Sequence, residues 1–312
     1  NPVINVVFLF VTVAVAFLIL SRDIQKGLER ITKYMMSALL VLMLVLAVHS
    51  ALLDGAADGL AFYLTPDFSK INGSVIVGAM NQAFFTLSTG MGGMAIFGSY
   101  IDKDHSLMGE SVNVIVLDTF VAILAGFIIF PACSTYGLEV NAGPSLLFDT
   151  MASVFNHMAG GRIWGTMFFL FMIFAALSTV LGVCENILAM VRELTGWSRP
   201  KGCIICGTGI FLLALTTALG YSVIHFQPFA EGTAWLDLWD FIVSNNVLPL
   251  GSLVLTLFCC NKFGWGWDNF VREANTGRGL KIRPWMRPVF QYITPVIIVF
   301  IYDYGMATFQ WR

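Results

Sequence analysis

The stretch FFTLSTGMGGMAIFGSY, residues 84–100, is apolar at both ends but polar in its middle. A helix inside a bilayer must hydrogen-bond all of its own backbone, and glycine weakens a helix. The middle of this stretch nevertheless combines hydroxyl side chains with closely spaced glycines: Thr86, Ser88, Thr89, Gly90, Gly92 and Gly93. This pattern predicts either an interrupted helix whose freed backbone groups bind a ligand, or a glycine-rich helix surface on which another helix packs closely.

The composition of the whole chain places this stretch in a membrane protein. Hydrophobic residues make up 57% of the 312 residues, charged residues only 12%, and the mean hydropathy is +0.79, which is too apolar for a soluble domain. The net charge of −2 comes without a basic patch and gives no sign of a nucleic-acid partner. We therefore expect an all-α, multi-pass protein in a lipid bilayer. The predicted spans are 3–20, 34–52, 78–101, 112–131, 163–191, 203–220, 241–260 and 288–305.

The distribution of basic residues predicts the orientation of these spans. Fourteen of the seventeen Lys and Arg residues fall in the connections 21–33, 102–111, 192–202 and 261–287, which should therefore face the cytoplasm. Both ends of the chain would then lie outside. The first residues, NPVINVVFLF, lack the features of a signal peptide. We interpret the chain as part of a longer protein in which an odd number of spans comes first.

Two other spans carry polar groups at membrane depth. Asp118 lies about a third of the way into an apolar span, where an acid marks an ion path or a paired charge, unless it reaches the interface. A second span carries small and polar residues at helical spacing, which can pack helices or bind a hard cation through oxygen atoms. These residues are Ala175, Ser178, Thr179, Gly182 and Glu185.

Two further features of the sequence need an interpretation. The outer connection 132–162 is too long for a simple turn and shows a helical pattern near 144–157. The pair CIIC, residues 203–206, has the spacing of a redox or metal motif, but no second Cys or His pair lies nearby, so we interpret it as the start of an apolar helix.

Five segments in order resemble one family, the bacterial neurotransmitter:sodium symporters typified by the bacterial leucine transporter. NQAFFTLSTGMGGMAIFGSYIDKDH (81–105), DTFVAILAGFIIFP (118–131), AALSTVLGVCENIL (175–188) and LDLWDFIVSNNVLPLG (236–251) look like its sixth, seventh, eighth and tenth helices. DIQKGLERITKYMM (23–36) resembles the junction of the fourth and fifth helices. The resemblance implies an inverted-repeat bundle without its first three helices. Residues 1–52 would end the first repeat, residues 78–260 would form the second, and 288–305 would be the eleventh helix.

The resemblance also implies a function and a set of sites. The function is sodium-coupled import of an amino acid through a bacterial inner membrane, with the missing N-terminal helices completing the sites. The substrate positions would be Phe85, Thr86, Ser88, Gly90, Met91, Thr179 and Val183. Thr86 and Asp118 would serve a first sodium ion, and Ala175, Ser178 and Thr179 a second. Gln82, Phe85 and Asp240 match the outer gate.

Two departures from the family pattern change the expectations. Asp118 stands where the leucine transporter has a sodium-ligating Asn, and one turn later Ala122 replaces a Glu or, in chloride-dependent relatives, a Ser. Compared with the leucine transporter, the acidic side chain lies one turn earlier in the helix. We expect this fixed negative charge to take the place of chloride, so that transport needs no chloride. In the family's fifth helix, a Gly is followed ten residues later by a Pro, and this pair is linked to unwinding of the helix during inward opening. Here Ser37 stands ten residues after Gly27, so sodium release by this unwinding is not expected from the pattern.

Three functions compete at this point. A sodium-coupled amino-acid symporter comes first, because of the resemblance. The flexible thioether of Met91 favours a hydrophobic or aromatic L-amino acid as its substrate. A related broken-helix carrier of another solute comes second, and a non-transporting membrane sensor third. Sodium-dependent substrate binding would separate the first from the others. An enzyme is not expected, since no span holds a catalytic constellation.

Overall fold

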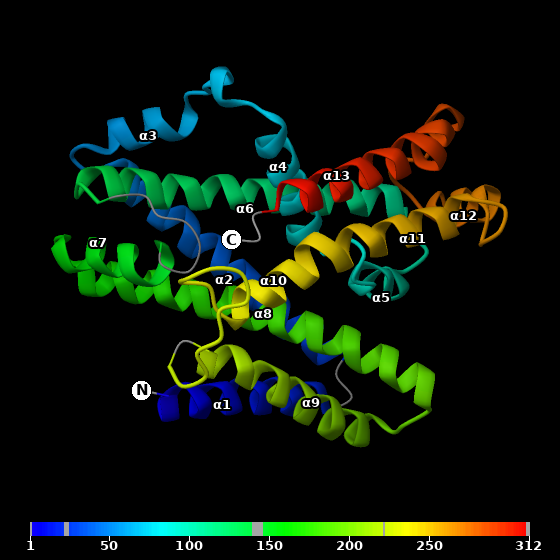
Figure 1. The fold of residues 1–312 in the computed structure, drawn as a ribbon, viewed down its shortest axis with the longest axis horizontal. Helices are drawn as coiled ribbons and strands as arrows, with labels where there is room; N and C mark the ends of the chain where they lie inside the picture. The colour runs from blue at the N-terminus through cyan, green and yellow to red at the C-terminus, as the bar shows by residue number, and fades with distance from the viewer. Residues whose placement is uncertain (1, 22–24, 139–145, 221, 310–312) are drawn as a thin grey trace. The chain divides into compact units, whose positions relative to one another are not determined.

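The computed structural model describes residues 2–21, 25–138, 146–220 and 222–309. All of the regular elements in these ranges are helices (Figure 1). The α-helices are α1 (Pro2–Ser21), α2 (Gln25–Ala51), α3 (Ala56–Leu64), α4 (Gly73–Thr86), α5 (Gly93–Ser99), α6 (Leu107–Thr135), α7 (Met151–His157), α8 (Gly161–Thr195), α9 (Arg199–Gly220), α10 (Trp235–Asp240), α11 (Leu248–Cys260), α12 (Trp267–Ala274) and α13 (Thr294–Thr308). Shorter 3₁₀ or π segments are η1 (Phe68–Lys70), η2 (Leu146–Thr150), η3 (Phe241–Val247), η4 (Pro284–Met286) and η5 (Val289–Ile293).

Seven helical stretches in the described ranges are long and apolar enough to cross a membrane. They correspond to seven of the eight predicted spans. They are Pro2–Ser21, Lys33–Ala51, Leu107–Thr135, Gly161–Thr195, Arg199–Gly220, Trp235–Cys260 and Pro284–Thr308. The span predicted to begin at residue 241 begins earlier, at Trp235, because η3 joins α10 to α11 without interruption.

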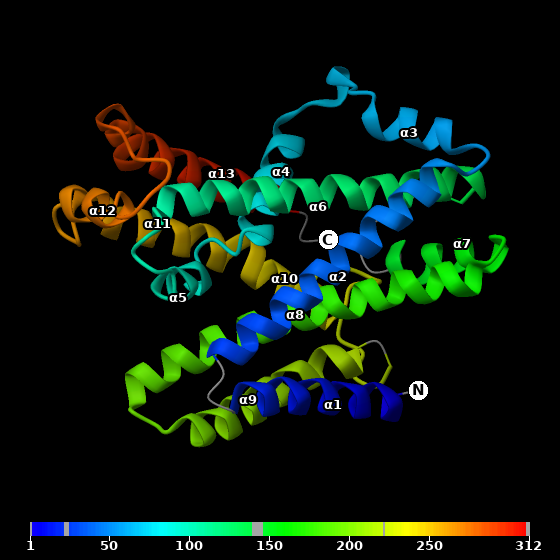
Figure 2. The same ribbon diagram turned by 180° about the vertical axis from the view of Figure 1, so that it is seen from behind.

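The remaining predicted span, 78–101, is not one helix. Helix α4 ends at Thr86 and α5 begins at Gly93, and Figure 2 shows the two as separate rods. The two rods have 14 and 7 residues, so neither half could cross a bilayer of about 30 Å by itself. The interrupted helix, one of the two alternatives that the hydroxyl and glycine pattern predicts, is therefore confirmed.

Backbone contacts divide the chain into two compact units. The first comprises residues 1–22, 70–116 and 182–312, and the second comprises residues 23–69 and 117–181. The boundary between them falls inside α6 and α8. The predicted division into repeats at 1–52 and 78–260 concerns internal symmetry and stays a prediction.

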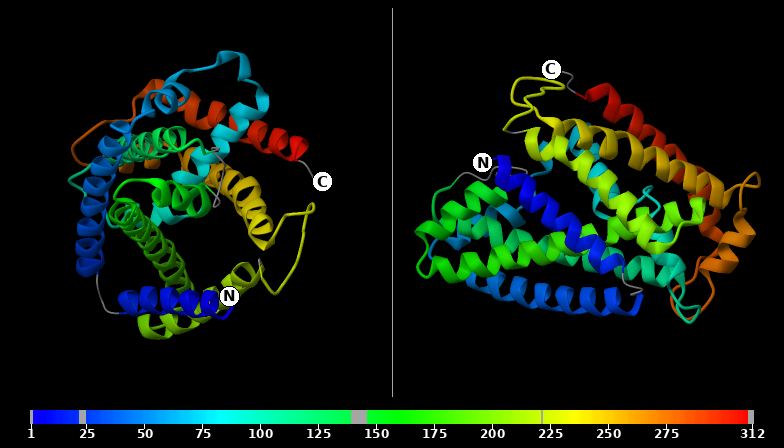
Figure 3. Two further views of the ribbon diagram at one scale, coloured as in Figure 1. Left: turned by 90° about the vertical axis from the view of Figure 1, so that its left-hand side faces the viewer. Right: turned by 90° about the horizontal axis from the view of Figure 1, so that it is seen from below.

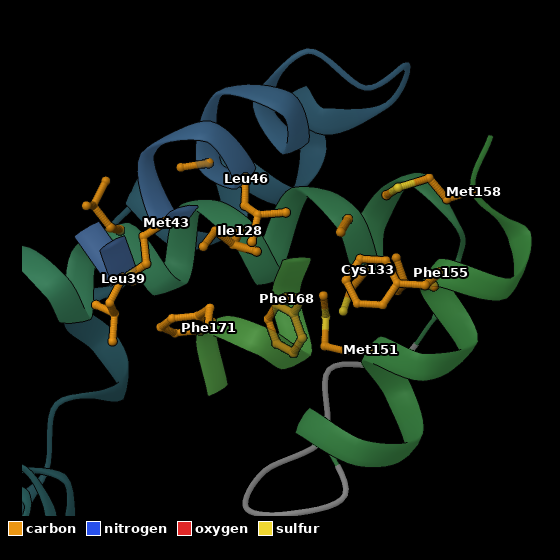
Figure 4. Close-up of a cluster of buried hydrophobic side chains, with 14 residues drawn as sticks. Leu39, Met43, Leu46, Ile128, Cys133, Met151, Phe155, Met158, Phe168 and Phe171 are labelled. Atoms are coloured by element: carbon orange, nitrogen blue, oxygen red, sulfur yellow. The ribbon is translucent and has the colours of Figure 1, made fainter. Parts of the chain in front are cut away.

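The second unit has an apolar core built from α2, α6, α7 and α8 (Figure 4). Leu39, Met43 and Leu46 face this core because residues four and three apart share one side of a helix. Cys133 and Phe168 meet them from α6 and α8, and both are almost fully buried. Across the same core, the hydroxyl of Ser50 donates a 2.7 Å hydrogen bond to the carbonyl of Ile128.

The long connection 132–162 is partly helical, as its pattern predicts. Segments η2 and α7 cover residues 146–157, and Met151 and Phe155 of α7 belong to the core of the second unit. This confirms the predicted helix over the residues that the structure describes, while 144 and 145 lie outside them.

The first unit contains two groups of packed helices. Helices α1 and α9 lie side by side, as Figure 3 shows, with the Phe17 ring against Gly207 and the Phe10 and Phe211 rings 5.8 Å apart. Helices α4, α11 and α13 form the other group, to which η3 also contributes. This second group carries the broken helix, so its contacts define the surroundings of the candidate site.

Candidate functional site

The break between α4 and α5 is a short run of left-handed backbone. The amide of Ser88 donates to the Phe85 carbonyl at 3.0 Å, and the amide of Thr89 to the Phe84 carbonyl at 3.1 Å, a pair of bonds that ends a helix in the Schellman motif. Three φ angles are then positive, at 50° for Ser88, 82° for Gly90 and 80° for Gly92. Glycine adopts such angles without strain. Ser88 is the only residue other than glycine with a positive φ in the described ranges, and this backbone conformation costs about 1–2 kcal/mol.

The break leaves two helix ends facing the same short segment. A helix end leaves its last carbonyls, and a helix start its first amides, without intrahelical partners. At the end of α4, the amides of Ser88 and Thr89 supply partners for the carbonyls of Phe85 and Phe84. Amides at a helix start favour negative groups, and carbonyls at a helix end favour cations. A broken helix of this kind can therefore hold both an anionic substrate group and a cation.

The segment packs backbone to backbone against α11. A Cβ atom placed on Gly90 would lie 2.3 Å from the carbonyl oxygen of Leu248. A Cβ atom on Gly251 would lie 2.3 Å from the carbonyl oxygen of Gly90. Both positions therefore require glycine, because no Cβ fits at such distances. Close packing, which the sequence offered as an alternative to ligand binding, thus occurs in the same segment.

The C-terminal part of α8 supports the segment from another side. The side-chain amide of Asn186 donates a 3.3 Å hydrogen bond to the carbonyl of Met91. One turn earlier, Gly182 leaves room for the ring of Phe97 on α5. The sequence analysis did not single out Asn186. A polar residue inside an apolar span one turn after Gly182 was the signal that could have identified it.

The residues predicted for the second sodium ion lie on one turn of α8. The hydroxyls of Ser178 and Thr179 both donate to the carbonyl of Ala175, at 2.8 and 3.1 Å. Three oxygen atoms thus gather on one turn, and their chemistry suits a hard cation. No group of three or more His, Cys, Asp or Glu side chains suited to a metal ion occurs in the described ranges.

Asp118 lies in the middle of α6 and is half-buried. It belongs to the second unit, together with Ala175, Ser178 and Thr179. The other predicted site residues belong to the first unit: Gln82, Phe85, Thr86, Ser88, Gly90, Met91, Val183 and Asp240. The predicted residues are thus divided between the two units.

The predicted gate residue Asp240 ends α10, where π-helical backbone begins. Its carboxylate accepts a 2.7 Å hydrogen bond from the hydroxyl of Ser244. Segment η3 follows directly and packs against α4, the helix that carries Gln82 and Phe85. The sequence analysis did not anticipate this π segment. π-Helical turns are often found at functional sites, because they shift side chains out of the regular helical positions.

A buried ion pair lies in the first unit and was not predicted. Glu185 is only 2% exposed, and its carboxylate lies 2.7 Å from a guanidinium nitrogen of Arg199. Arg199 also donates to the Leu20 carbonyl at 2.5 Å, and the Tyr100 hydroxyl donates to Glu185 at 3.4 Å. The sequence analysis assigned Glu185 to a packing stripe and Arg199 to a connection. An acid within a span needs a partner, and that rule could have suggested the pair.

Comparisons with known proteins match nearly the whole chain. The model of the sodium:neurotransmitter symporter family matches residues 4–311. An uncharacterized sodium-dependent transporter of Haemophilus influenzae is 32% identical over 93% of this chain and 63% of its own length. The Bacillus subtilis transporter YhdH is 31% identical over 99% of this chain and 69% of its own length.

A solved structure matches the fold. The crystal structure of MhsT in complex with L-phenylalanine superimposes with a TM-score of 0.86 and 34% identity, over 97% of this chain and 68% of that one. The chain therefore spans roughly two thirds of the length of these three proteins.

Proposed function

Because the chain belongs to the sodium:neurotransmitter symporter family, we propose that it forms part of a sodium-coupled importer of a hydrophobic or aromatic L-amino acid. The observation that carries this proposal is the left-handed segment from Ser88 to Gly92, which lies between α4 and α5 and is supported by Asn186 and Gly251. Helix ends at a break in a membrane bundle are suited to bind a zwitterion together with cations.

The substrate would lie against the break. We assign its contacts to Phe85, Thr86, Ser88, Gly90 and Met91, with Val183 and Thr179 from α8. The flexible thioether of Met91 adapts to large apolar side chains. The related MhsT was crystallised with L-phenylalanine, which supports a substrate of this class.

Two sodium ions would travel with the substrate. We assign the first to Thr86 and Asp118, and the second to the oxygen atoms of Ala175, Ser178 and Thr179. Relatives support sodium dependence in general, since two of them are described as sodium-dependent transporters. Asp118 would supply the negative charge that balances these cations, so chloride would not be required.

Further segments of the full-length protein would complete these sites. We propose that helices preceding residue 1 supply the remaining sodium ligands and an arginine partner for the gate of Gln82, Phe85 and Asp240. The protein would lie in a bacterial inner membrane with the C-terminal end of this chain outside.

The test is uptake by the full-length protein in proteoliposomes. An inward sodium gradient should drive uptake of labelled phenylalanine or leucine, and replacing sodium with choline should abolish it. Unlabelled phenylalanine, leucine and tyrosine should compete better than glycine and alanine. Binding of amino acid without any effect of sodium would contradict the coupling, while better competition by glycine and alanine would contradict the substrate class.

A further inference from the structure

The connection between α11 and α13, residues 261–287, concentrates positive charge, contrary to the expectation from the sequence that the chain has no basic patch. It has six basic residues and two acidic ones, a formal net charge of +4 in a chain whose overall charge is −2. All six basic side chains are exposed, and none forms an ion pair among the described residues. These residues are Lys262, Arg272, Arg278, Lys281, Arg283 and Arg287. No acidic side chain of the described residues therefore neutralises these charges, although Arg272, Lys281 and Arg287 also donate hydrogen bonds within the chain.

Exposed apolar side chains lie among these charges. Phe263 is 80% exposed, Trp285 65% and Trp265 41%. Exposing large aromatic rings to water is unfavourable, so an exposed group of them marks an interaction surface. Aromatic rings beside basic residues at the ends of spans are typical of the membrane–water interface.

The connection is folded against its own small core. Trp267 and Ala274 of α12 pack with Cys260 and Ile282. The side chain of Asn275 both donates to the Ile282 carbonyl, at 3.0 Å, and accepts from its amide, at 2.7 Å. These contacts fix the backbone that carries the basic side chains.

The connection is also fixed to the chain that follows the broken helix. The amide of Arg278 donates to the Asp104 carbonyl at 2.7 Å, and the amide of Ser106 donates to the Arg278 carbonyl at 2.8 Å. The fully buried hydroxyl of Ser106 donates to the Leu280 carbonyl at 2.8 Å. In Figure 1 the segment with α12 accordingly lies beyond the ends of the paired helices α11 and α13.

We propose that residues 261–287 form a surface that binds the anionic headgroups of phospholipids at the membrane interface. The basic side chains would contact lipid phosphates, and Phe263, Trp265 and Trp285 would insert beside the acyl chains. Charge complementarity favours anionic phospholipids as the ligand, because an anionic membrane leaflet attracts basic segments that lie next to a span. This inference rests on the predicted cytoplasmic position of the connection and is independent of transport.

The test titrates the full-length protein in neutral detergent with short-chain phosphatidylglycerol, short-chain phosphatidylcholine or inorganic phosphate, and follows binding by thermophoresis. Phosphatidylglycerol should bind, and the other two should bind at least about tenfold more weakly. The variant Lys262→Gln/Arg283→Gln should weaken phosphatidylglycerol binding by about tenfold, since each basic residue near an anionic surface strengthens binding several-fold. Neither of these side chains makes a hydrogen bond within the described ranges that the change would remove.

The control variant Lys33→Gln/Lys201→Gln removes the same charge from the same predicted side but outside the connection, and should bind like the parent. Raising the salt concentration should weaken phosphatidylglycerol binding to the parent protein, a measurement that does not depend on any variant folding. Equal binding of the two lipids, equal binding of inorganic phosphate, no effect of salt, or equal losses in the two variants would each overturn the proposal.

Discussion

At the scale of single residues, Gly90 and Gly251 explain why the broken helix tolerates no side chain where it meets α11. Each glycine faces a backbone atom of the other segment at a distance that excludes a Cβ. The glycines of the break therefore have two roles. Gly92 supplies only a left-handed turn, with nothing near its Cβ direction, whereas Gly90 supplies both the turn and the contact.

The change Gly251→Ala tests this contact. The new methyl group would press on the Gly90 carbonyl, and overpacking of this kind costs about 1–3 kcal/mol. We expect a lower thermal midpoint and weaker substrate binding in detergent-solubilised protein. Gly209→Ala is the control, because nothing lies near that position and alanine favours the helix. Equal midpoints for the two variants would contradict the contact.

The double change Ser178→Ala/Thr179→Ala tests the second sodium site. Loss of hydroxyl ligands should weaken sodium binding by about 1 kcal/mol or more, as for other buried polar groups that lose a partner. Thr208→Ala is the matched control, since its hydroxyl also donates to a carbonyl one turn back. The measurement is the sodium concentration that gives half-maximal substrate binding. If the double variant and the control needed the same concentration as the parent, the ion would bind elsewhere.

Asp118 decides the prediction about chloride. Cations brought beside a zwitterion in a low dielectric need a nearby negative charge. We expect the parent to transport equally well in chloride and in gluconate. Asp118→Ser should lose activity in gluconate and regain part of it in chloride, while Asp118→Asn should lose activity in at least one medium. A parent that needs chloride would disprove the assignment, as would variants that match the parent in both media.

At the scale of elements, the ion pair of Glu185 and Arg199 joins α8 to α9, and the bond from Arg199 to Leu20 adds α1. Both side chains are largely buried, so each charge depends on the other for compensation. The same pair contacts Tyr100 next to the end of α5. It therefore links the helix that follows the break to three others of the first unit.

Breaking this pair should destabilise the protein strongly. Glu185→Gln or Arg199→Met alone should cost about 3–5 kcal/mol, because one buried charge is left without its partner. The double variant should cost less than the sum of the two. The exposed pair of His105 and Glu110 provides a control, and Glu110→Gln should cost about 1 kcal/mol or less. Thermal midpoints in detergent measure all four variants, and additive losses for Glu185 and Arg199 would show that the charges do not interact.

The element scale also shows where sequence reasoning fails. Hydropathy located the span that contains η3 but not its π-helical segment. Hydropathy depends on side chains alone and does not tell whether a backbone amide donates to the carbonyl four or five residues back. The break at Ser88 was predictable, since closely spaced glycines change backbone preference locally.

At the scale of the whole molecule, orientation remains a prediction from the uneven distribution of basic residues. We expect a single cysteine at Ser69, in a variant without other cysteines, to react with an impermeant maleimide added to intact cells. A cysteine at Lys201 should react only after the membrane is made permeable. Both positions are exposed, so burial does not explain a difference between them. The reverse labelling pattern would invert the topology and remove the basis for the lipid surface.

The sequence by itself determined the membrane class, seven continuous spans and the position of the broken one. These features follow from hydropathy and from the backbone freedom of glycine, which act within a few residues of chain. Tertiary structure alone decided that Gly90 meets Gly251, that Asn186 supports Met91 and that Glu185 pairs with Arg199. Each of these contacts joins segments far apart in the chain or on different helices. The physical reason is that a polar group in an apolar span demands some partner, but only the packing of the helices decides which one.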